Sequence, residues 1–145
     1  MSATVLLIGG TRFLGRAIAE PFIAKGYRVY ELNRGTRPPT PGIVEPMVCD
    51  KADRTAFGAA LKSRTWDFVI DTILNDEDLT FVVETLGSQV GHFLHTGSLG
   101  VYGEARRIPA VESQPLAVVE EGEMKSGTVL FNYKIRQDQV LLRAF

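Results

Sequence analysis

The stretch TVLLIGGTRFLG, residues 4–15, decides the fold of this chain. Its first five residues form a continuous apolar run rich in branched side chains, which is typical of a strand buried in a parallel sheet. The run ends at two glycines, and beyond Phe13 the apolar residues recur at helical spacing. A strand, a glycine-rich turn and a helix in this order predict the first unit of an α/β sheet.

Strand-like and helix-like segments alternate along the rest of the chain. Further strands are expected at residues 27–32, 43–49, 66–72 and 92–96, and further helices at 53–62, 79–86 and 129–145. Pro21 should kink or interrupt the first helix. Strands that alternate with helices imply parallel pairing through right-handed crossovers. We therefore expect a Rossmann-type doubly wound parallel sheet with helices on both faces and the strand order 3-2-1-4-5.

The size and charge of the chain narrow its class. Its 145 residues suit one domain, residues 1–145. With 16 basic and 17 acidic residues the net charge is -1, so nucleic acid is an unlikely partner and a small molecule is expected. The single cysteine and the absence of a long apolar run predict a cytoplasmic protein that does not enter a membrane. No stop signal follows the last helix, so we expect the C-terminal substrate lobe to be absent.

The segment Gly9-Gly10-Thr11-Arg12-Phe13-Leu14-Gly15, here called the glycine-rich turn, is the candidate phosphate site. Gly9 allows a tight turn, and Gly15 allows the helix to pack closely on the strand. The start of the helix offers N–H groups and a positive dipole end to a pyrophosphate. The alternative is a tight turn that binds nothing.

These residues resemble the GxxGxxG turn of the extended short-chain dehydrogenase/reductases, the NAD-dependent epimerase/dehydratase family. The form GGTRFLG is similar to that of an atypical branch, which includes the chloroplast stem-loop-binding proteins. Arg12 stands where the family has its middle glycine, although its backbone N–H is still available. The resemblance implies an NAD(P)-binding domain that pairs as a homodimer and that lacks the family's C-terminal half.

The end of the second strand bears on the choice of cofactor. NAD enzymes of this kind usually carry an acidic residue there, but this chain has Asn33 followed by Arg34, with Arg37 and Arg12 expected nearby. A guanidinium grips a phosphate well, so NADP is predicted, with NAD possible. The alternative is a solvated loop. Asp50 matches a family position that contacts adenine.

Two further acidic residues near this site receive other roles. Asp53 is better explained as a helix N-cap than as a ligand to the cofactor. Glu31 should point to the opposite side of the second strand from the neighbours of Asn33, so it is not counted among the cofactor-binding residues.

The resemblance also implies catalytic positions. Residues 96–103, TGSLGVYG, are similar to the family's SSxxVYG segment, which makes Ser98, or Thr96, the substrate hydroxyl. The alternative is that Ser98 caps a loop. Tyr133 is the tyrosine of YxxxK, but Gln137 replaces the lysine, and Arg136 shares the tyrosine's face and could supply the cation.

Two classes of function remain open. The first is an NAD(P)-dependent oxidoreductase, epimerase or dehydratase that acts on a sugar nucleotide or a similar carbonyl compound. The second is a non-catalytic NAD(P)-binding sensor or interaction module, which the altered tyrosine–lysine pair favours. A nucleic-acid-binding role lacks a basic patch. His92 and His95 are expected to serve packing rather than a metal, and no metal site is predicted.

Overall fold

The computed structural model of the protein describes residues 2–102, 111, 113–115, 117 and 126–144. The chain divides into two compact units. Residues 1–74 and 81–96 form the first unit, and residues 75–80 and 97–145 form the second.

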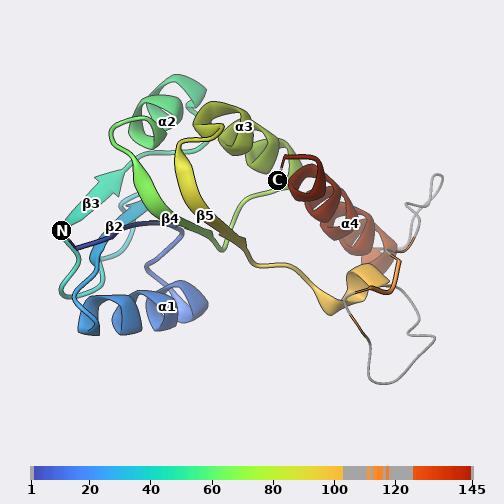
Figure 1. Ribbon diagram of the computed structural model, residues 1–145, viewed down its shortest axis with the longest axis horizontal. Coiled ribbons are helices and arrows are strands. Elements are labelled where there is room, and N and C mark those ends of the chain that lie inside the picture. Colours follow the sequence, from blue (N-terminus) through green and yellow to red (C-terminus); the bar gives the residue numbers. More distant parts are fainter. Residues whose placement is uncertain (1, 103–110, 112, 116, 118–125, 145) are drawn as a thin grey trace. The chain divides into compact units, whose positions relative to one another are not determined.

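A five-stranded parallel sheet is the centre of the first unit (Figure 1). Its strands are β1 (Thr4–Ile8), β2 (Arg28–Asn33), β3 (Glu45–Val48), β4 (Trp66–Asp71) and β5 (Val90–His95). They lie in the order β3-β2-β1-β4-β5, so the predicted order is confirmed. β1 is central, and Leu6 pairs with Tyr30 on one side and with Val69 on the other. The order reverses beside β1, and ligands of such sheets bind at this point, beyond the carboxyl ends of the strands.

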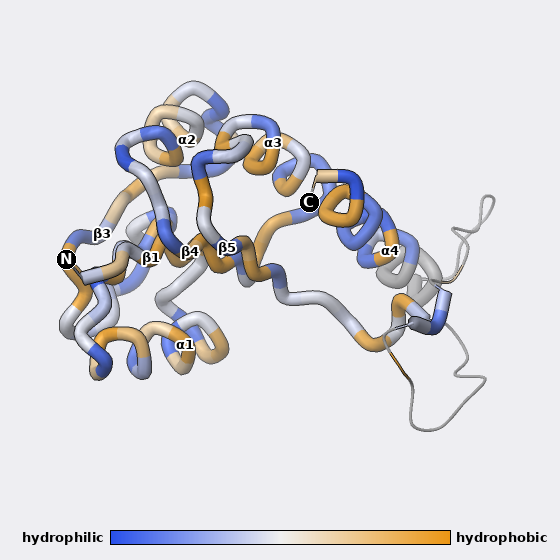
Figure 2. The backbone as a smooth tube through the Cα atoms, in the orientation of Figure 1, coloured by the Kyte–Doolittle hydropathy of each residue, from blue (hydrophilic) through white to orange (hydrophobic). Residues whose placement is uncertain are grey.

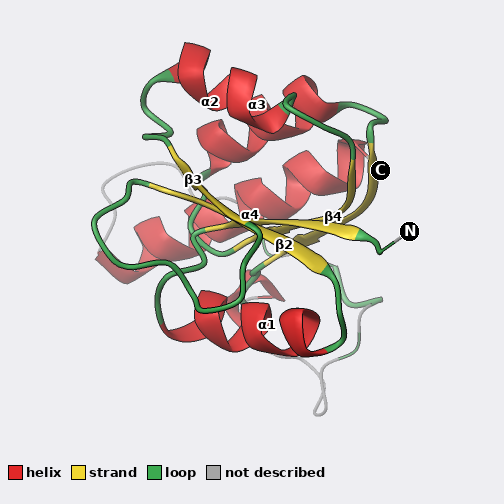
Figure 3. Ribbon diagram, turned by 90° about the vertical axis from the view of Figure 1, so that its left-hand side faces the viewer, coloured by secondary structure: helices red, strands yellow, loops and turns green. Residues whose placement is uncertain are grey.

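Helices cover both faces of the sheet, as predicted. The helices are α1 (Phe13–Ala24), α2 (Arg54–Leu61), α3 (Asp76–Leu86) and α4 (Ser126–Ala144), with a short 3-10 helix, η1 (Leu99–Tyr102). In the first unit α1 lies on one face of the sheet and α2 on the other (Figure 3). Phe57 of α2 stacks on Phe81 of α3 with 5.8 Å between ring centroids. The sheet is therefore doubly wound.

Two apolar layers fill the space between the sheet and its helices. On the α1 side the buried residues are Val5, Leu7, Ala19, Val29 and Ile70. On the other side Trp66, the only tryptophan of the chain, is 2% exposed and meets the ring of Tyr30 edge to face. Its Nε1 donates to the Leu61 carbonyl oxygen at 2.7 Å, which joins β4 to the end of α2.

Pro21 does not interrupt α1, so that part of the prediction is wrong. The proline lies in the last turn of the helix, which continues to Ala24. The Lys25 N–H donates to the Pro21 carbonyl oxygen at 3.1 Å. Only one helical hydrogen bond is lost at this end, so the helix continues past the proline.

The second unit consists of α4, η1 and the start of α3. η1 packs against α4, and Arg136 Nε donates to Asp76 Oδ2 at 2.9 Å. Hydrophobic and hydrophilic residues alternate along α4 (Figure 2), and Leu142 is 74% exposed. Most of the segment between η1 and α4, and Phe145 at the end of the helix expected at residues 129–145, lie outside the described residues. Among the residues that the structure describes, no helix has the length and apolar character to cross a membrane.

Candidate cofactor site

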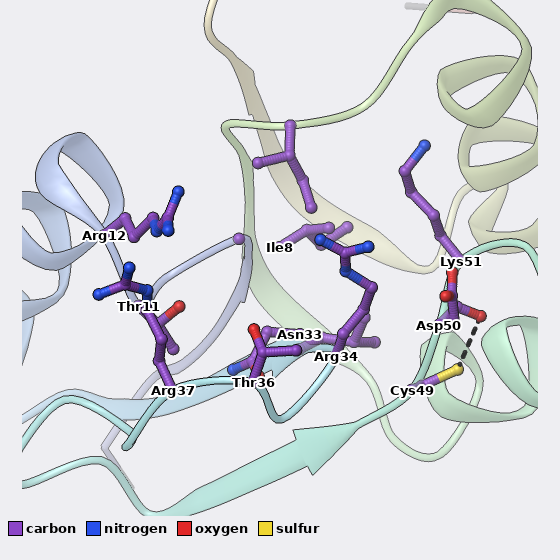
Figure 4. A pocket seen from close by; sticks show the side chains of 13 residues that line it. Ile8, Thr11, Arg12, Asn33, Arg34, Thr36, Arg37, Cys49, Asp50 and Lys51 are labelled. Atoms are coloured by element: carbon purple, nitrogen blue, oxygen red, sulfur yellow. Dashed lines mark hydrogen bonds between the residues drawn. The ribbon is translucent and has the colours of Figure 1, made fainter.

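A cavity of about 420 Å³ opens in the first unit, beyond the carboxyl ends of β1, β2 and β3 (Figure 4). Three loops, which follow these strands, and one residue after β4 form its walls. The lining residues are Ile8, Gly9, Thr11, Arg12, Leu32, Asn33, Arg34, Thr36, Arg37, Cys49, Asp50, Lys51 and Ile73. The cavity therefore lies where the sequence places the cofactor.

The glycine-rich turn forms the first wall and leaves no room for side chains at its two ends. Gly9 has a φ of +93°, and its N–H donates to the Leu32 carbonyl oxygen at 3.0 Å. A Cβ on Gly15 would overlap the Gly9 carbonyl oxygen and lie 2.8 Å from the Gly10 Cα. The start of α1 therefore packs directly on the backbone of the turn.

The seven residues of the turn take different places. Gly9, Thr11 and Arg12 line the cavity. Gly10 and Gly15 are buried behind the wall, whereas Phe13 and Leu14 turn outward and are 96% and 42% exposed. Phe13 also has a φ of +30°, a left-handed conformation that is strained for a bulky residue.

The N-terminus of α1 faces the cavity through its N-cap. Arg12 is the N-cap residue, with extended φ and ψ, and its side chain caps no N–H group. The first N–H groups of a helix have no partner within the helix, and the helix dipole makes this end positive. Because Arg12 lines the cavity, these features suit an anionic group such as a pyrophosphate.

The segment of residues 34–40 after β2, here called the basic loop, forms the second wall. Asn33 Oδ1 accepts from the Gly35 N–H at 2.7 Å, which fixes the start of the loop. Arg34, Thr36 and Arg37 of the loop line the cavity. Arg12 and Arg37 reach in from one side, and Lys51 stands on the opposite side (Figure 4).

The third wall follows β3 and contains Cys49, Asp50 and Lys51. Asp50 Oδ1 accepts from the Ala52 N–H at 2.9 Å, and the Asp50 carbonyl oxygen accepts from Cys49 Sγ at 3.4 Å. Burial raises the pKa of the Cys49 thiol, and the carboxylates of Asp53 and Asp50 raise it further.

Asp53 does not line the cavity and caps α2. Its Oδ1 accepts from the Ala56 N–H at 3.0 Å, so the N-cap prediction is confirmed.

The charged side chains that line the cavity are four basic ones, Arg12, Arg34, Arg37 and Lys51, and one acidic one, Asp50. This excess of positive charge favours an anionic ligand.

A buried Asp–His pair, which the sequence pattern does not predict, supports the wall after β4. Asp71 Oδ2 lies 2.6 Å from His95 Nδ1, and both side chains are buried. Asp71 Oδ1 accepts from the N–H groups of Ile73 and Leu74, both at 2.8 Å. Thr72 Oγ1 donates to the Gly9 carbonyl oxygen at 3.1 Å, so this wall is tied to the glycine-rich turn.

The two histidines therefore have different surroundings. His95 has a carboxylate partner, which strand alternation alone could not reveal, whereas His92 stacks on Phe68 with 5.3 Å between ring centroids. Among the described residues, no group of three or more metal-ligating side chains could hold a metal ion.

The predicted catalytic residues Ser98, Tyr133 and Arg136 belong to the second unit, whereas the alternative hydroxyl, Thr96, ends the first unit and donates to the Asp71 carbonyl oxygen at 2.9 Å. Ser98 is exposed, and its Oγ accepts from the Gly100 N–H at 3.2 Å. The cationic partner proposed for Tyr133 is paired elsewhere, because Arg136 Nε donates to Asp76. Gln137 is fully buried, and Lys134 Nζ lies 5.4 Å from the centre of the Tyr133 ring.

Solved structures share this fold. The Bordetella bronchiseptica enzyme WbmG in complex with NAD matches with a TM-score of 0.75 at 15% identity, over 99% of this chain and 50% of that one. UDP-glucose 4-epimerase from Bifidobacterium longum, in complex with NAD+ and UDP, matches with a TM-score of 0.71 at 19% identity. The match covers 97% of this chain and 48% of that one.

A third example is dTDP-glucose 4,6-dehydratase from Bacillus anthracis in complex with NAD. Its TM-score is 0.69 at 13% identity, over 99% of this chain and 50% of that one. The chain thus spans about half the length of the solved structures that it matches. Among curated protein sequences, none matches the chain.

The family model of the NAD dependent epimerase/dehydratase family matches residues 5–85, which is more than half of the chain. The matched residues include the glycine-rich turn, the basic loop and every residue that lines the cavity. The family model and the fold of the similar structures indicate the same family, and the chain belongs to the NAD dependent epimerase/dehydratase family.

Proposed function

We propose that this chain is the NADP-binding part of an oxidoreductase, epimerase or dehydratase that acts on a sugar nucleotide or a similar carbonyl compound. The observation that carries the proposal is the cavity itself, which combines the glycine-rich turn with four basic side chains and one acidic one. The pyrophosphate of the cofactor would lie at the N-terminus of α1, and the adenosine would extend toward the basic loop.

The residues at the end of β2 support NADP over NAD. An acidic side chain there would accept hydrogen bonds from the ribose hydroxyls and repel a 2′-phosphate. Asn33 is neutral, and its Oδ1 is already engaged by the Gly35 N–H. Arg34 and Arg37 line the cavity next to it, and each guanidinium can form charge-assisted hydrogen bonds with a phosphate.

The ligands of the similar structures support the proposed substrate class. WbmG has been solved with NAD and UDP, and so has the epimerase from Bifidobacterium longum. A sugar nucleotide is therefore the first class of substrate to test. Ser98 would orient its carbonyl group, and Tyr133 would exchange a proton with it.

One observation favours a second function, a binding module without catalysis. The position one helical turn beyond Tyr133 holds the buried Gln137, and the Arg136 guanidinium is paired with Asp76. In the part of α4 that the structure describes, Lys134 is the basic residue adjoining the tyrosine ring. A redox sensor would need the cavity but not this tyrosine–lysine pair.

We also propose a cytoplasmic homo-oligomer. The family resemblance supports pairing through helices, and the exposed Leu142 on α4 offers an apolar contact. The lone Cys49 needs no oxidising compartment.

Calorimetric titration with NADP and with NAD tests the cofactor assignment. Arg34→Ala should weaken NADP binding about tenfold or more and leave NAD binding nearly unchanged, because one charge-assisted phosphate contact is lost. Arg16→Ala is the matched control, since Arg16 pairs with Glu20 on the surface of α1 and does not line the cavity. Equal affinity for NAD and NADP in the unmodified chain would rule out the NADP assignment.

A further inference from the structure

Glu31 is a fully buried acid in the middle of β2 that does not line the cavity. It lies between Leu7 of β1 and Pro46 of β3 in the sheet register. Val29, two residues earlier on the strand, belongs to the apolar layer on the α1 side. Side chains two residues apart in a strand share a face, so Glu31 projects to that side as well. An acid in this place needs an explanation, because a buried carboxylate is costly unless its oxygens are satisfied.

The carboxylate joins two walls of the cavity. Glu31 Oε2 accepts from the Thr40 N–H at 3.1 Å, at the far end of the basic loop. A Cβ on Gly10 would lie 2.7 Å from Glu31 Oε1, so the carboxylate fills the space that the glycine leaves in the turn. Glu31 Oε1 and the Thr40 hydroxyl are buried and have no hydrogen-bond partner among the described residues. The contact is therefore enclosed, not a solvated surface pair.

The basic loop is anchored at both ends. Asn33 Oδ1 accepts from the Gly35 N–H at the start, and Glu31 Oε2 accepts from the Thr40 N–H at the end. The residues between these anchors include Arg34 and Arg37, which line the cavity. Prolines at 38, 39 and 41 stiffen the second half of the loop, so a shift of Thr40 would be transmitted to Arg37.

The two segments that Glu31 contacts carry the basic side chains of the cavity. Arg12 belongs to the glycine-rich turn, and Arg34 and Arg37 belong to the basic loop. Its strand neighbours in the register, Leu7 and Pro46, are uncharged. On α1, Arg16 and Glu20 pair with each other at the surface.

We propose that Glu31 is a positioning residue that sets the preference of the cavity for NADP over NAD, because it holds the basic loop against the glycine-rich turn. This inference rests on the proposed function. A 2′-phosphate needs the guanidinium groups of the loop at fixed places, whereas NAD uses mainly the turn and the helix start. Release of Thr40 therefore weakens NADP binding more than NAD binding.

The test compares Kd for NADP and for NAD in the unmodified chain and in three variants. Glu31→Ala removes the acceptor, and we expect about a tenfold loss of NADP affinity with a change of less than about twofold for NAD. Thr40→Pro removes the donor N–H from the other partner and should give the same loss. Glu31→Gln keeps an oxygen that accepts from the Thr40 N–H and should keep the NADP preference.

The possible outcomes separate the two proposals. An unmodified chain that binds neither nucleotide, or that binds both equally, overturns the NADP assignment and the role of Glu31 with it. A preference that survives both Glu31→Ala and Thr40→Pro overturns the role of Glu31 alone. Equal weakening of both nucleotides, or loss of the fold in both variants by circular dichroism, also overturns it, since Glu31 would then support the whole domain.

Discussion

Asp71 Oδ2 lies 2.6 Å from His95 Nδ1, and this buried contact ties the carboxyl end of β4 to that of β5. The other oxygen of Asp71 holds the turn that carries Ile73 into the cavity wall. The pair therefore supports both the sheet and the cofactor site.

Replacement of Asp71 should destabilise the protein. Asp71→Asn removes the charge and places an amide beside the His95 ring, so the free energy of unfolding should fall by about 3 kcal/mol. Urea unfolding followed by circular dichroism measures the change. Asp67→Asn, an exposed position on the same strand, should cost less, and an equal cost for both variants would contradict the prediction.

The contribution of Asp67, the control position, to the free energy of unfolding depends on pH. Hydrogen bonds from the Thr4 N–H and hydroxyl lower the pKa of Asp67. A carboxyl with a lowered pKa stabilises the fold above its unfolded pKa of about 3.9, and this contribution is lost as the pH falls through the lowered value. The comparison of Asp71→Asn with Asp67→Asn therefore belongs near pH 7.

A single methyl group should close the phosphate site. In Gly15→Ala the new Cβ would meet the backbone of Gly9 and Gly10, and we expect about 1–3 kcal/mol of lost stability and at least about tenfold weaker NADP binding. The matched control is Gly58→Ala, where the nearest atom to the new Cβ is Phe81 Cζ at 3.4 Å. This helix glycine should tolerate alanine or gain about 0.5–1 kcal/mol. Unchanged NADP binding in Gly15→Ala would show that the phosphates of the nucleotide do not bind at the glycine-rich turn.

The Cys49 thiol reports on occupancy of the cavity. Its pKa is raised by burial and by Asp53 and Asp50, so little thiolate exists at neutral pH and alkylation by iodoacetamide should be slow. The rate should keep rising beyond about pH 8.5, where the rate of a thiol with an ordinary pKa levels off. Saturating NADP should slow the reaction at every pH, because the cofactor would cover this wall. Equal rates with and without a nucleotide that binds by calorimetry would place the nucleotide elsewhere.

This chain should show little or no hydride transfer even in the presence of saturating NADPH. The cation that lowers the tyrosine pKa in this family is replaced by Gln137, and Arg136 is held by Asp76. Oxidation of NADPH is measured with a panel of sugar nucleotides and carbonyl compounds. Gln137→Lys should raise any turnover, and Tyr133→Phe serves as the blank. Substantial turnover by the unmodified chain that Tyr133→Phe eliminates would show that another cation, such as Lys134, replaces the lysine.

Self-association should depend on the exposed side of α4. Leu142 is 74% exposed, and a leucine in that position is favourable to bury against a second copy. Sedimentation velocity at micromolar concentration should show a dimer, and Leu142→Lys should shift it toward the monomer. A monomer in the unmodified chain would contradict the prediction.

Local patterns made most of the sheet predictable. Apolar runs and changes of period give β1 and α1, because each depends on neighbours within a few residues. The strand order follows from the topology that is general to doubly wound parallel sheets. The ends of elements were less certain. The strand expected at 43–49 is β3 only over Glu45–Val48, since strand pairing and not hydropathy sets its limits.

The contacts that the sequence could not give join distant residues. Asp71 meets His95, which lies 24 residues later in the chain, and Arg136 meets Asp76, which lies 60 residues earlier. Helical geometry placed Arg136 on the side of Tyr133, but it could not identify a carboxylate partner on another helix. The strand period gives only the side of β2 on which Glu31 lies, whereas its contact with Thr40 depends on the path of the loop.

The place of Trp66 makes it a selective optical probe. The chain has one tryptophan, which is the first residue of β4 in the first unit. Its ring contacts the Tyr30 ring, and its Nε1 donates to the Leu61 carbonyl oxygen at the end of α2. Its emission therefore follows the melting of the sheet, whereas the far-ultraviolet signal also includes the long α4 of the second unit. Coincident fluorescence and circular dichroism curves would mean that both units unfold as one cooperative body, and separated curves would mean that they unfold one after the other.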